Sequence, residues 1–134
     1  MTASFTILGS GSSGGVPRPA LGWGACDPSN PRNRRRRTSL LVERRNGAGV
    51  TRVLVDTSPD LREQLLDAEV DWLDAVLFTH EHADHTHGID VCARSLSAVG
   101  GGSTCIWTTS LRRRCAPASA IASRRLPEVN TRRS

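Results

Sequence analysis

The segment His80-Glu81-His82-Ala83-Asp84-His85 decides how the rest of the sequence is interpreted. It places three imidazoles and two carboxylates within six residues, and the fourth histidine of the chain, His87, follows two positions later. Imidazole nitrogen and carboxylate oxygen together suit Zn²⁺, Mn²⁺ or Fe²⁺. Neighbouring ligands on one loop can hold two ions, and two ions about 3.5–4 Å apart can share a hydroxide. The segment therefore predicts a metal centre, against the alternative of solvated loop histidines.

The residues before this segment predict an α/β unit that ends at the metal centre. Four stretches have the β-rich or apolar pattern of strands: residues 4–8, 38–43, 51–56 and 75–78. Asn46-Gly47 predicts a hairpin turn between the second and third of them. Ser58-Pro59-Asp60 predicts the start of a short helix, with Ser58 as its N-cap.

A long irregular excursion separates the first two predicted strands. Residues 9–15 are rich in Gly and Ser, and no GK[ST] follows them, so they predict a tight turn rather than a P-loop. Residues 16–37 are rich in Pro, Gly and Arg. The run Arg34 to Arg37 either steers an anionic substrate or belongs to a solvated loop without a specific role.

The charge of the chain is divided unevenly. Residues 1–90 hold 10 Arg and 12 acidic residues, whereas residues 91–134 hold 8 Arg and one acid, Glu128. We therefore expect a domain at residues 1–90 and an irregular tail at residues 91–134, which shows no sustained period of 2 or 3.6. The tail is interpreted either as the product of a shifted reading frame, as a genuine disordered segment, or as a folded or nucleic-acid-binding arm.

Composition also bounds the location of the protein. No run approaches 18 apolar residues, so we expect no membrane span. The first ten residues lack a basic stretch followed by a long apolar one, so we expect no secretory signal. The four cysteines form no CxxC pair, which favours reduced thiols and a cytoplasmic location.

The spacing His80-x-His82-x-Asp84-His85 after an apolar strand resembles the HxHxDH signature of the metallo-β-lactamase superfamily. Other segments are similar to the branch that contains phosphoribosyl cyclic phosphate phosphodiesterases and ribonuclease Z-like enzymes, namely residues 7–17, 33–40, 55–61 and 85–90. The resemblance implies an α/β fold: the N-terminal part of an αββα sandwich, with its metal site at one sheet edge.

The resemblance also implies roles for individual residues. His80 and His82 would bind a first metal ion, and Asp84 and His85 a second, with Zn²⁺ expected before Mn²⁺ or Fe²⁺. Asp84 is also the expected catalytic carboxylate, and Asp56 is expected to support the ligands from behind. His87 is expected behind the ligands or facing solvent. The implied activity is hydrolysis of a phosphodiester or cyclic phosphate by a metal-bound hydroxide, on a small phosphodiester or nucleotide-like substrate.

The sequence departs from the family pattern downstream of the motif. The family carries at least two further His and a metal-bridging Asp there, but this chain has no His after His87 and no Asp after Asp90. Only Cys26 lies where the branch often has a Cys cluster for structural zinc. We therefore expect a chain that is truncated or out of frame after about residue 90, with impaired activity. Two alternatives stay open: an inactive metal-binding fragment of a disrupted gene, and a nucleic-acid-binding module that uses the Arg-rich tail.

Overall fold

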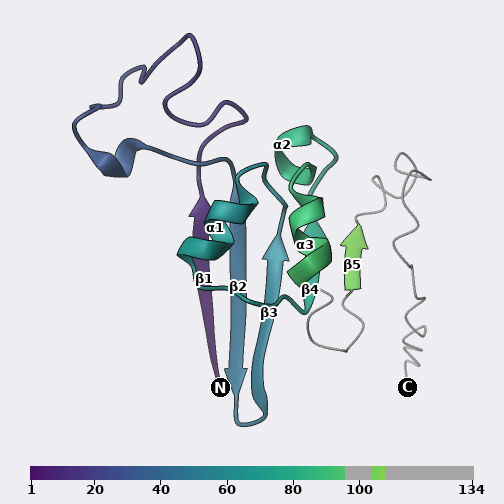
Figure 1. Cartoon of the computed structure of the whole chain (residues 1–134). Helices are drawn as coiled ribbons and strands as arrows, with labels where there is room; N and C mark the ends of the chain where they lie inside the picture. The colour runs from purple at the N-terminus through teal and green to yellow at the C-terminus, as the bar shows by residue number, and fades with distance from the viewer. Residues whose placement is uncertain (96–103, 108–134) are drawn as a thin grey trace, which may run out of the picture.

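The computed structural model describes residues 1–95 and 104–107, which form one sheet with helices packed on it (Figure 1). The strands lie side by side in chain order: β1 (Thr2–Gly9), β2 (Ser39–Asn46), β3 (Gly49–Val55), β4 (Ala75–Phe78) and β5 (Thr104–Trp107). The described helices are η1 (Pro31–Asn33), α1 (Leu61–Asp67), α2 (Ala83–Thr86) and α3 (Ile89–Ser95).

The sheet changes from antiparallel to parallel at β3. The pairs β1–β2 and β2–β3 are antiparallel, and the pairs β3–β4 and β4–β5 are parallel. The predicted hairpin is confirmed, and its strands are longer than expected, because Arg45 pairs with Val50 and Asn46 with Gly49. Parallel neighbours need a crossover, which α1 provides between β3 and β4.

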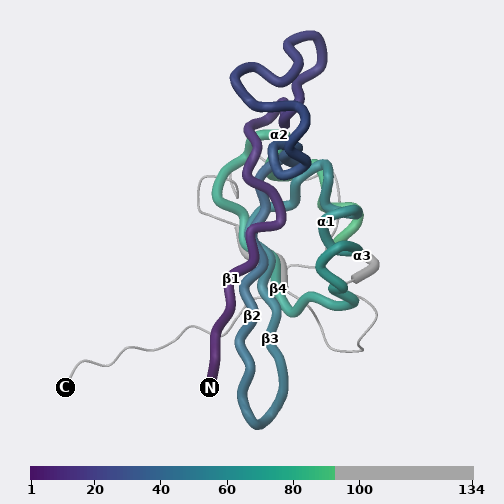
Figure 2. Tube along the Cα trace, turned by 90° about the vertical axis from the view of Figure 1, so that its left-hand side faces the viewer, coloured from purple at the N-terminus to yellow at the C-terminus, as the bar shows by residue number. Residues whose placement is uncertain are grey.

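The core lies between the sheet and its helices. Helices α1 and α3 cover the same face of the sheet in both ribbon and tube views (Figures 1 and 2). Leu41 pairs with Leu54, and Leu54 with Val76, so these three side chains form one buried row beneath the helices. The buried apolar cluster contains Leu41, Leu54, Leu61, Leu65, Leu73, Val76, Phe78 and Cys92.

The opposite face of the sheet is also apolar. Its central row joins Ile7, Leu40, Val55 and Leu77 through successive strand pairs. Ile7 is 71% exposed. An apolar sheet face of this kind is buried against another layer in a sandwich. The described residues therefore form a sheet with one helical layer, which is the expected N-terminal part of an α/β sandwich.

Helix α1 begins later than the sequence predicted. Its N-cap is Asp60, whose side chain makes no capping hydrogen bond, so the prediction of Ser58 as the N-cap was wrong. The Ser58 hydroxyl instead accepts a hydrogen bond from Asp60 N (3.1 Å) and donates one to Gln64 Oε1 (2.7 Å). Because Ser58 and Gln64 are both buried, this pairing satisfies two polar groups inside the fold.

The boundary expected at Asp90 falls inside helix α3. Cys92 of this helix is fully buried within the apolar cluster, and β5 pairs with β4. Residues 96–103 and 108–134 lie outside the described residues, and so do most of the predictions made for the tail. Within the ranges 1–95 and 104–107, no helix is long and apolar enough to cross a membrane.

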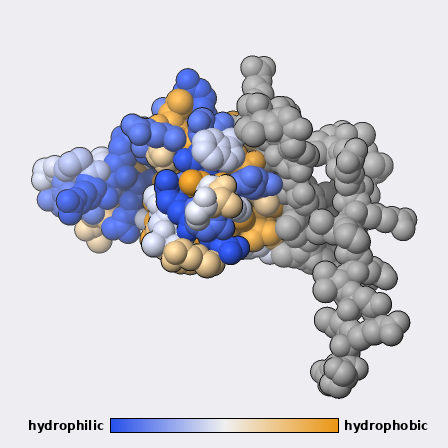
Figure 3. Space-filling model, turned by 90° about the horizontal axis from the view of Figure 1, so that it is seen from below, coloured by the Kyte–Doolittle hydropathy of each residue, from blue (hydrophilic) through white to orange (hydrophobic). Residues whose placement is uncertain are grey.

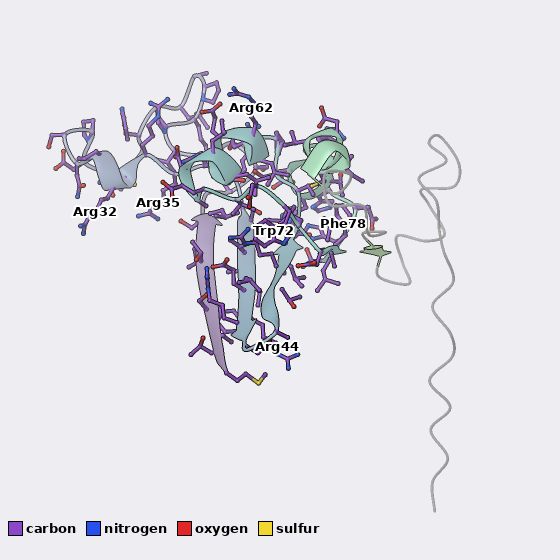
Figure 4. The ribbon with its side chains drawn as sticks, turned by 60° about the horizontal axis from the view of Figure 1, so that its bottom comes forward. Arg32, Arg35, Arg44, Arg62, Trp72 and Phe78 are labelled. Carbon is purple, nitrogen blue, oxygen red and sulfur yellow. The ribbon has the colours of Figure 1, made fainter. Side chains whose placement is uncertain are left out.

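The outgoing and returning parts of the excursion after β1 are joined by backbone hydrogen bonds. Val16 and Arg35 exchange backbone hydrogen bonds of 2.9 Å, and Gly11 N donates to Arg36 O (2.8 Å). A Cβ at Gly9 would lie 2.0 Å from Arg37 O, so the Gly-rich turn permits a close approach to this returning segment. The protruding end of the excursion is mainly hydrophilic (Figure 3), and Arg32 and Arg35 project from it (Figure 4).

Candidate metal centre

The histidine-rich segment forms a tight loop at the end of β4. After Phe78, residues 79–82 lead into α2, a single helical turn with His82 as its N-cap. His85 N donates to His82 O (2.9 Å), and the Thr86 hydroxyl donates to the same carbonyl (3.1 Å). Gly88 N then donates to Thr57 O (3.0 Å), while Thr57 N donates to His85 O (2.7 Å). These bonds join the loop to the end of β3.

Asp56 connects β3 to the histidine loop. Its side chain is buried, and its backbone has φ +62°, which is uncommon outside glycine. Oδ1 accepts a hydrogen bond from Thr79 N (2.8 Å), and Oδ2 lies 2.6 Å from Thr79 Oγ1 and 2.8 Å from His85 Nδ1. The carboxylate is therefore surrounded by polar groups of the histidine loop.

Three of the predicted ligand histidines lie together. The ring centroid of His80 is 4.6 Å from that of His82 and 4.0 Å from that of His85. One potential ligand atom from each of Asp56, His80 and His85 lies within 4.8 Å of the other two. The oxygens of Asp56 are engaged with Thr79 and His85, and its expected supporting role stays a prediction.

The remaining predicted residues lie on or beside α2. Asp84 Oδ2 is 3.6 Å from His85 Nε2, so these two potential ligand atoms lie close together. Asp84 and His85 are partly buried, whereas His82 and His87 are exposed. His87 caps the end of α2 through its backbone, with N donating to Ala83 O (3.0 Å). The assignments of ligands and of Asp84 as the catalytic carboxylate stay predictions.

The donor set fits a divalent transition metal. Nδ1 of His85 is occupied by the Asp56 carboxylate, which directs Nε2 toward Asp84. A carboxylate behind a histidine is the usual support of a metal-ligating imidazole. His80 Nδ1 likewise contacts Thr79 Oγ1 at 2.9 Å, which leaves Nε2 as the nitrogen that faces outward for a ligand. Imidazole and carboxylate donors in this arrangement suit Zn²⁺.

An ion pair fixes the end of the excursion beside this centre. Asp60 Oδ2 accepts hydrogen bonds from Arg37 N (2.9 Å) and Arg37 Nε (2.8 Å), and Arg37 Nη2 contacts Asp60 Oδ1. The Arg37 guanidinium thereby holds the pKa of Asp60 below its usual range. Asp60 in turn raises the pKa of Arg37, with a smaller contribution from Asp84, so Arg37 lies within electrostatic reach of the centre.

Asp60→Asn is expected to destabilise the protein by about 1.5–3 kcal/mol at pH 7, because a charge-assisted, bidentate contact is lost. The pKa of Asp60 is lowered in the folded protein. Its contribution is therefore complete above the ordinary Asp pKa and is lost as pH falls through the lower folded value. The difference in free energy of unfolding between wild type and variant should shrink below about pH 4, as measured by urea unfolding at several pH values.

The neighbouring pair Arg36–Asp67 provides a matched control. Its Asp67 side chain is 65% exposed, so Asp67→Asn should cost less than about 1 kcal/mol. Equal losses in both variants, or a loss for Asp60→Asn that persists unchanged at pH 3, would contradict the proposed role of the Arg37–Asp60 pair.

The fold and the site together define a class of protein: an α/β sheet that carries an HxHxDH segment at the end of a parallel strand. The chain belongs to the β-lactamase superfamily, since the family model described as "Beta-lactamase superfamily domain" matches residues 51–131. The match begins in β3, includes the whole histidine segment, and continues beyond Asp90 into the segment that we expected to be irregular.

The chain is also similar to individual known proteins. An octanoyltransferase of Porphyromonas gingivalis (strain ATCC BAA-308 / W83) is 48% identical over 84 residues, covering 63% of this chain and 16% of that protein. A new diphosphatase from the PhnP family, known from its crystal structure, is 40% identical in sequence to this chain, with a TM-score of 0.66. The similarity covers 75% of this chain and 39% of that chain. Zn²⁺-bound PqqB from Methylobacterium extorquens is 25% identical, with a TM-score of 0.52, over 66% of this chain and 32% of that one.

These comparisons agree with the family that the sequence predicted. The similarity to a diphosphatase supports the phosphodiesterase-like branch. This chain spans only 39% of the diphosphatase and 16% of the octanoyltransferase. The activity that each of these names describes therefore belongs to a longer protein.

Sequence reasoning missed Thr79 and Asp60 as residues beside the site, and it named Arg37 only within the run Arg34 to Arg37. Thr79 was taken only as the residue where a strand ends, although a hydroxyl directly before a ligand histidine is a signal of hydrogen-bonding support. Asp60 was taken as an ordinary cap or turn acid. Its partner Arg37 is 23 residues away, and no local pattern links the two.

Proposed function

We propose that this chain forms the metal centre of a metal-dependent hydrolase that acts on a phosphodiester or cyclic phosphate. The observation that carries the proposal is the clustering of the proposed ligands: the ring centroid of His80 lies 4.6 Å from that of His82 and 4.0 Å from that of His85, and Asp84 Oδ2 lies 3.6 Å from His85 Nε2. The named activity of the similar diphosphatase supports a phosphate substrate. We propose a small phosphodiester or nucleotide-like molecule, and a cytoplasmic location for the protein.

The chain's own residues would divide the work as follows. His80 and His82 would hold one ion, and Asp84 and His85 a second; we propose Zn²⁺, with Mn²⁺ and Fe²⁺ as alternatives. When bound, such ions supply the Lewis acidity that polarises a phosphoryl oxygen and activates water. Asp56 would orient His85 by accepting a hydrogen bond from its Nδ1–H group.

His82→Ala tests this proposal. We expect the wild type to bind Zn²⁺ and to hydrolyse bis(p-nitrophenyl) phosphate, and the variant to lose at least about 100-fold in kcat/KM, because a ligand that positions the reacting groups is gone. Metal content by elemental analysis and release of p-nitrophenol are measured on the same sample. Asp90→Asn, which changes an exposed acid at the start of α3, should retain both properties.

A second candidate is a metal-binding protein without turnover. It is favoured by the distribution of histidines in this sequence, since all four lie within residues 80–87. Stoichiometric metal that depends on His82, without hydrolysis of the phosphodiester, would support this candidate. Absence of both metal and hydrolysis in the wild type would contradict both functions.

A further inference from the structure

One buried carboxylate contacts His85 directly and is connected to His80 through Thr79. Asp56 is 3% exposed, and its Oδ2 receives both His85 Nδ1 (2.8 Å) and Thr79 Oγ1 (2.6 Å). The Thr79 hydroxyl also contacts His80 Nδ1 at 2.9 Å. Thr79 therefore lies between Asp56 and His80, while His85 contacts Asp56 directly.

The number of protons available to Asp56, Thr79 and His80 determines which group donates in each hydrogen bond between them. An ionised carboxylate only accepts hydrogen bonds, and a threonine hydroxyl has a single proton to donate. The 2.6 Å separation of Thr79 Oγ1 from Asp56 Oδ2 is typical of a hydroxyl that donates to a carboxylate. The hydroxyl must then accept from His80, so His80 Nδ1 carries the proton and Nε2 carries the lone pair.

The opposite direction is physically unfavourable. If Thr79 donated to His80 Nδ1, its oxygen would face Asp56 Oδ2 at 2.6 Å with no proton between the two acceptors. That arrangement needs a protonated Asp56, although the same oxygen already receives His85 Nδ1 and the other oxygen receives Thr79 N. Both carboxylate oxygens therefore already accept hydrogen bonds from the loop.

We propose that Thr79 is a positioning residue that sets the tautomer of His80, so that Asp56 controls both His85 and, through the Thr79 hydroxyl, His80. The consequence is that both rings present Nε2 lone pairs before any metal arrives. This proposal rests on the proposed metal centre, because its value lies in preparing one histidine ligand for each of the two proposed ions.

Thr79→Val tests the proposal, with Thr79→Ser as its matched control. Valine keeps the branched shape but lacks the hydroxyl, whereas serine keeps the hydroxyl. In the metal-free, ¹⁵N-labelled full chain, ring nitrogen shifts at a pH where the histidines are neutral should show His80 protonated at Nδ1 in wild type and Thr79→Ser. In Thr79→Val that preference should be lost, while His87, whose ring is exposed, should not change.

Zinc affinity supplies a second readout. Loss of a residue that supports a metal ligand typically weakens affinity about 10–100-fold, so we expect that decrease for Thr79→Val and near-wild-type affinity for Thr79→Ser. The proposal is overturned if wild-type His80 is protonated at Nε2, a result that needs no variant to fold. It is also overturned if Thr79→Ser and Thr79→Val lose affinity equally. Because the tautomer is read without metal, its outcome is separable from failure of the proposed hydrolase.

Discussion

Asp56→Asn is expected to weaken zinc binding about 10–100-fold, which is typical when the group behind a ligating histidine is removed. The new amide can keep the acceptor for Thr79 N, but it puts an NH₂ where Oδ2 received His85 Nδ1 and Thr79 Oγ1. His85 then has no acceptor for its Nδ1 proton, and its Nε2 lone pair is no longer assured. Competition with a zinc chelator of known affinity measures the effect.

Asparagine is the informative replacement because it separates chemistry from backbone strain. Asp56 has φ +62°, a region that Asn tolerates better than most residues. Alanine would add strain and a cavity to the loss of the acceptor. Asp90→Asn, an exposed carboxylate on α3, controls for the change in charge. Unchanged zinc affinity in a folded Asp56→Asn protein would show that Asp56 does not orient the ligands.

The local parts of this site were predictable from sequence. His80, His82, Asp84 and His85 are close in the chain, so their spacing alone indicated that they can share a centre. The strands were predictable for the same reason, since the patterns around Leu41 and Leu54 have the length and composition of strands. The hairpin between the second and third strands was predicted from Asn46-Gly47. The other strand pairs were not predictable, because their register depends on contacts between segments that are far apart in sequence.

The non-local parts of the site depend on tertiary packing. Asp56 meets His85 across 29 positions, and Arg37 meets Asp60 across 23. Ser58 has the residue type of an N-cap, yet its hydroxyl bonds a buried Gln64 instead. For Ser58 a local preference was available, and burial selected another partner, because an unsatisfied polar group inside the fold is costly.

Gly88 shows how closely the histidine loop packs on the end of β3. A Cβ at this position would lie 2.1 Å from the backbone oxygen of Ser58 and 3.0 Å from Leu61 Cβ. The neighbouring backbone cannot move away easily, since Gly88 N donates to Thr57 O and Thr57 N donates to His85 O. The histidine loop and the strand end that supports it therefore leave no room for a methyl group at position 88.

Gly88→Ala is thus expected to destabilise the protein by about 3 kcal/mol or more, at the upper end of the range for overpacked sites. This is a large part of the total stability of an ordinary domain, which is about 5–15 kcal/mol. Urea unfolding followed by circular dichroism measures it. Gly47→Ala is the matched control, because no atom lies within 4 Å of its new Cβ, and a change within about 0.5 kcal/mol is expected there. If Gly88→Ala were equally mild, the loop would not pack on Ser58 as described. The shared bonds of Thr57 and Gly88 also imply that the loss of stability and a loss of zinc affinity occur together.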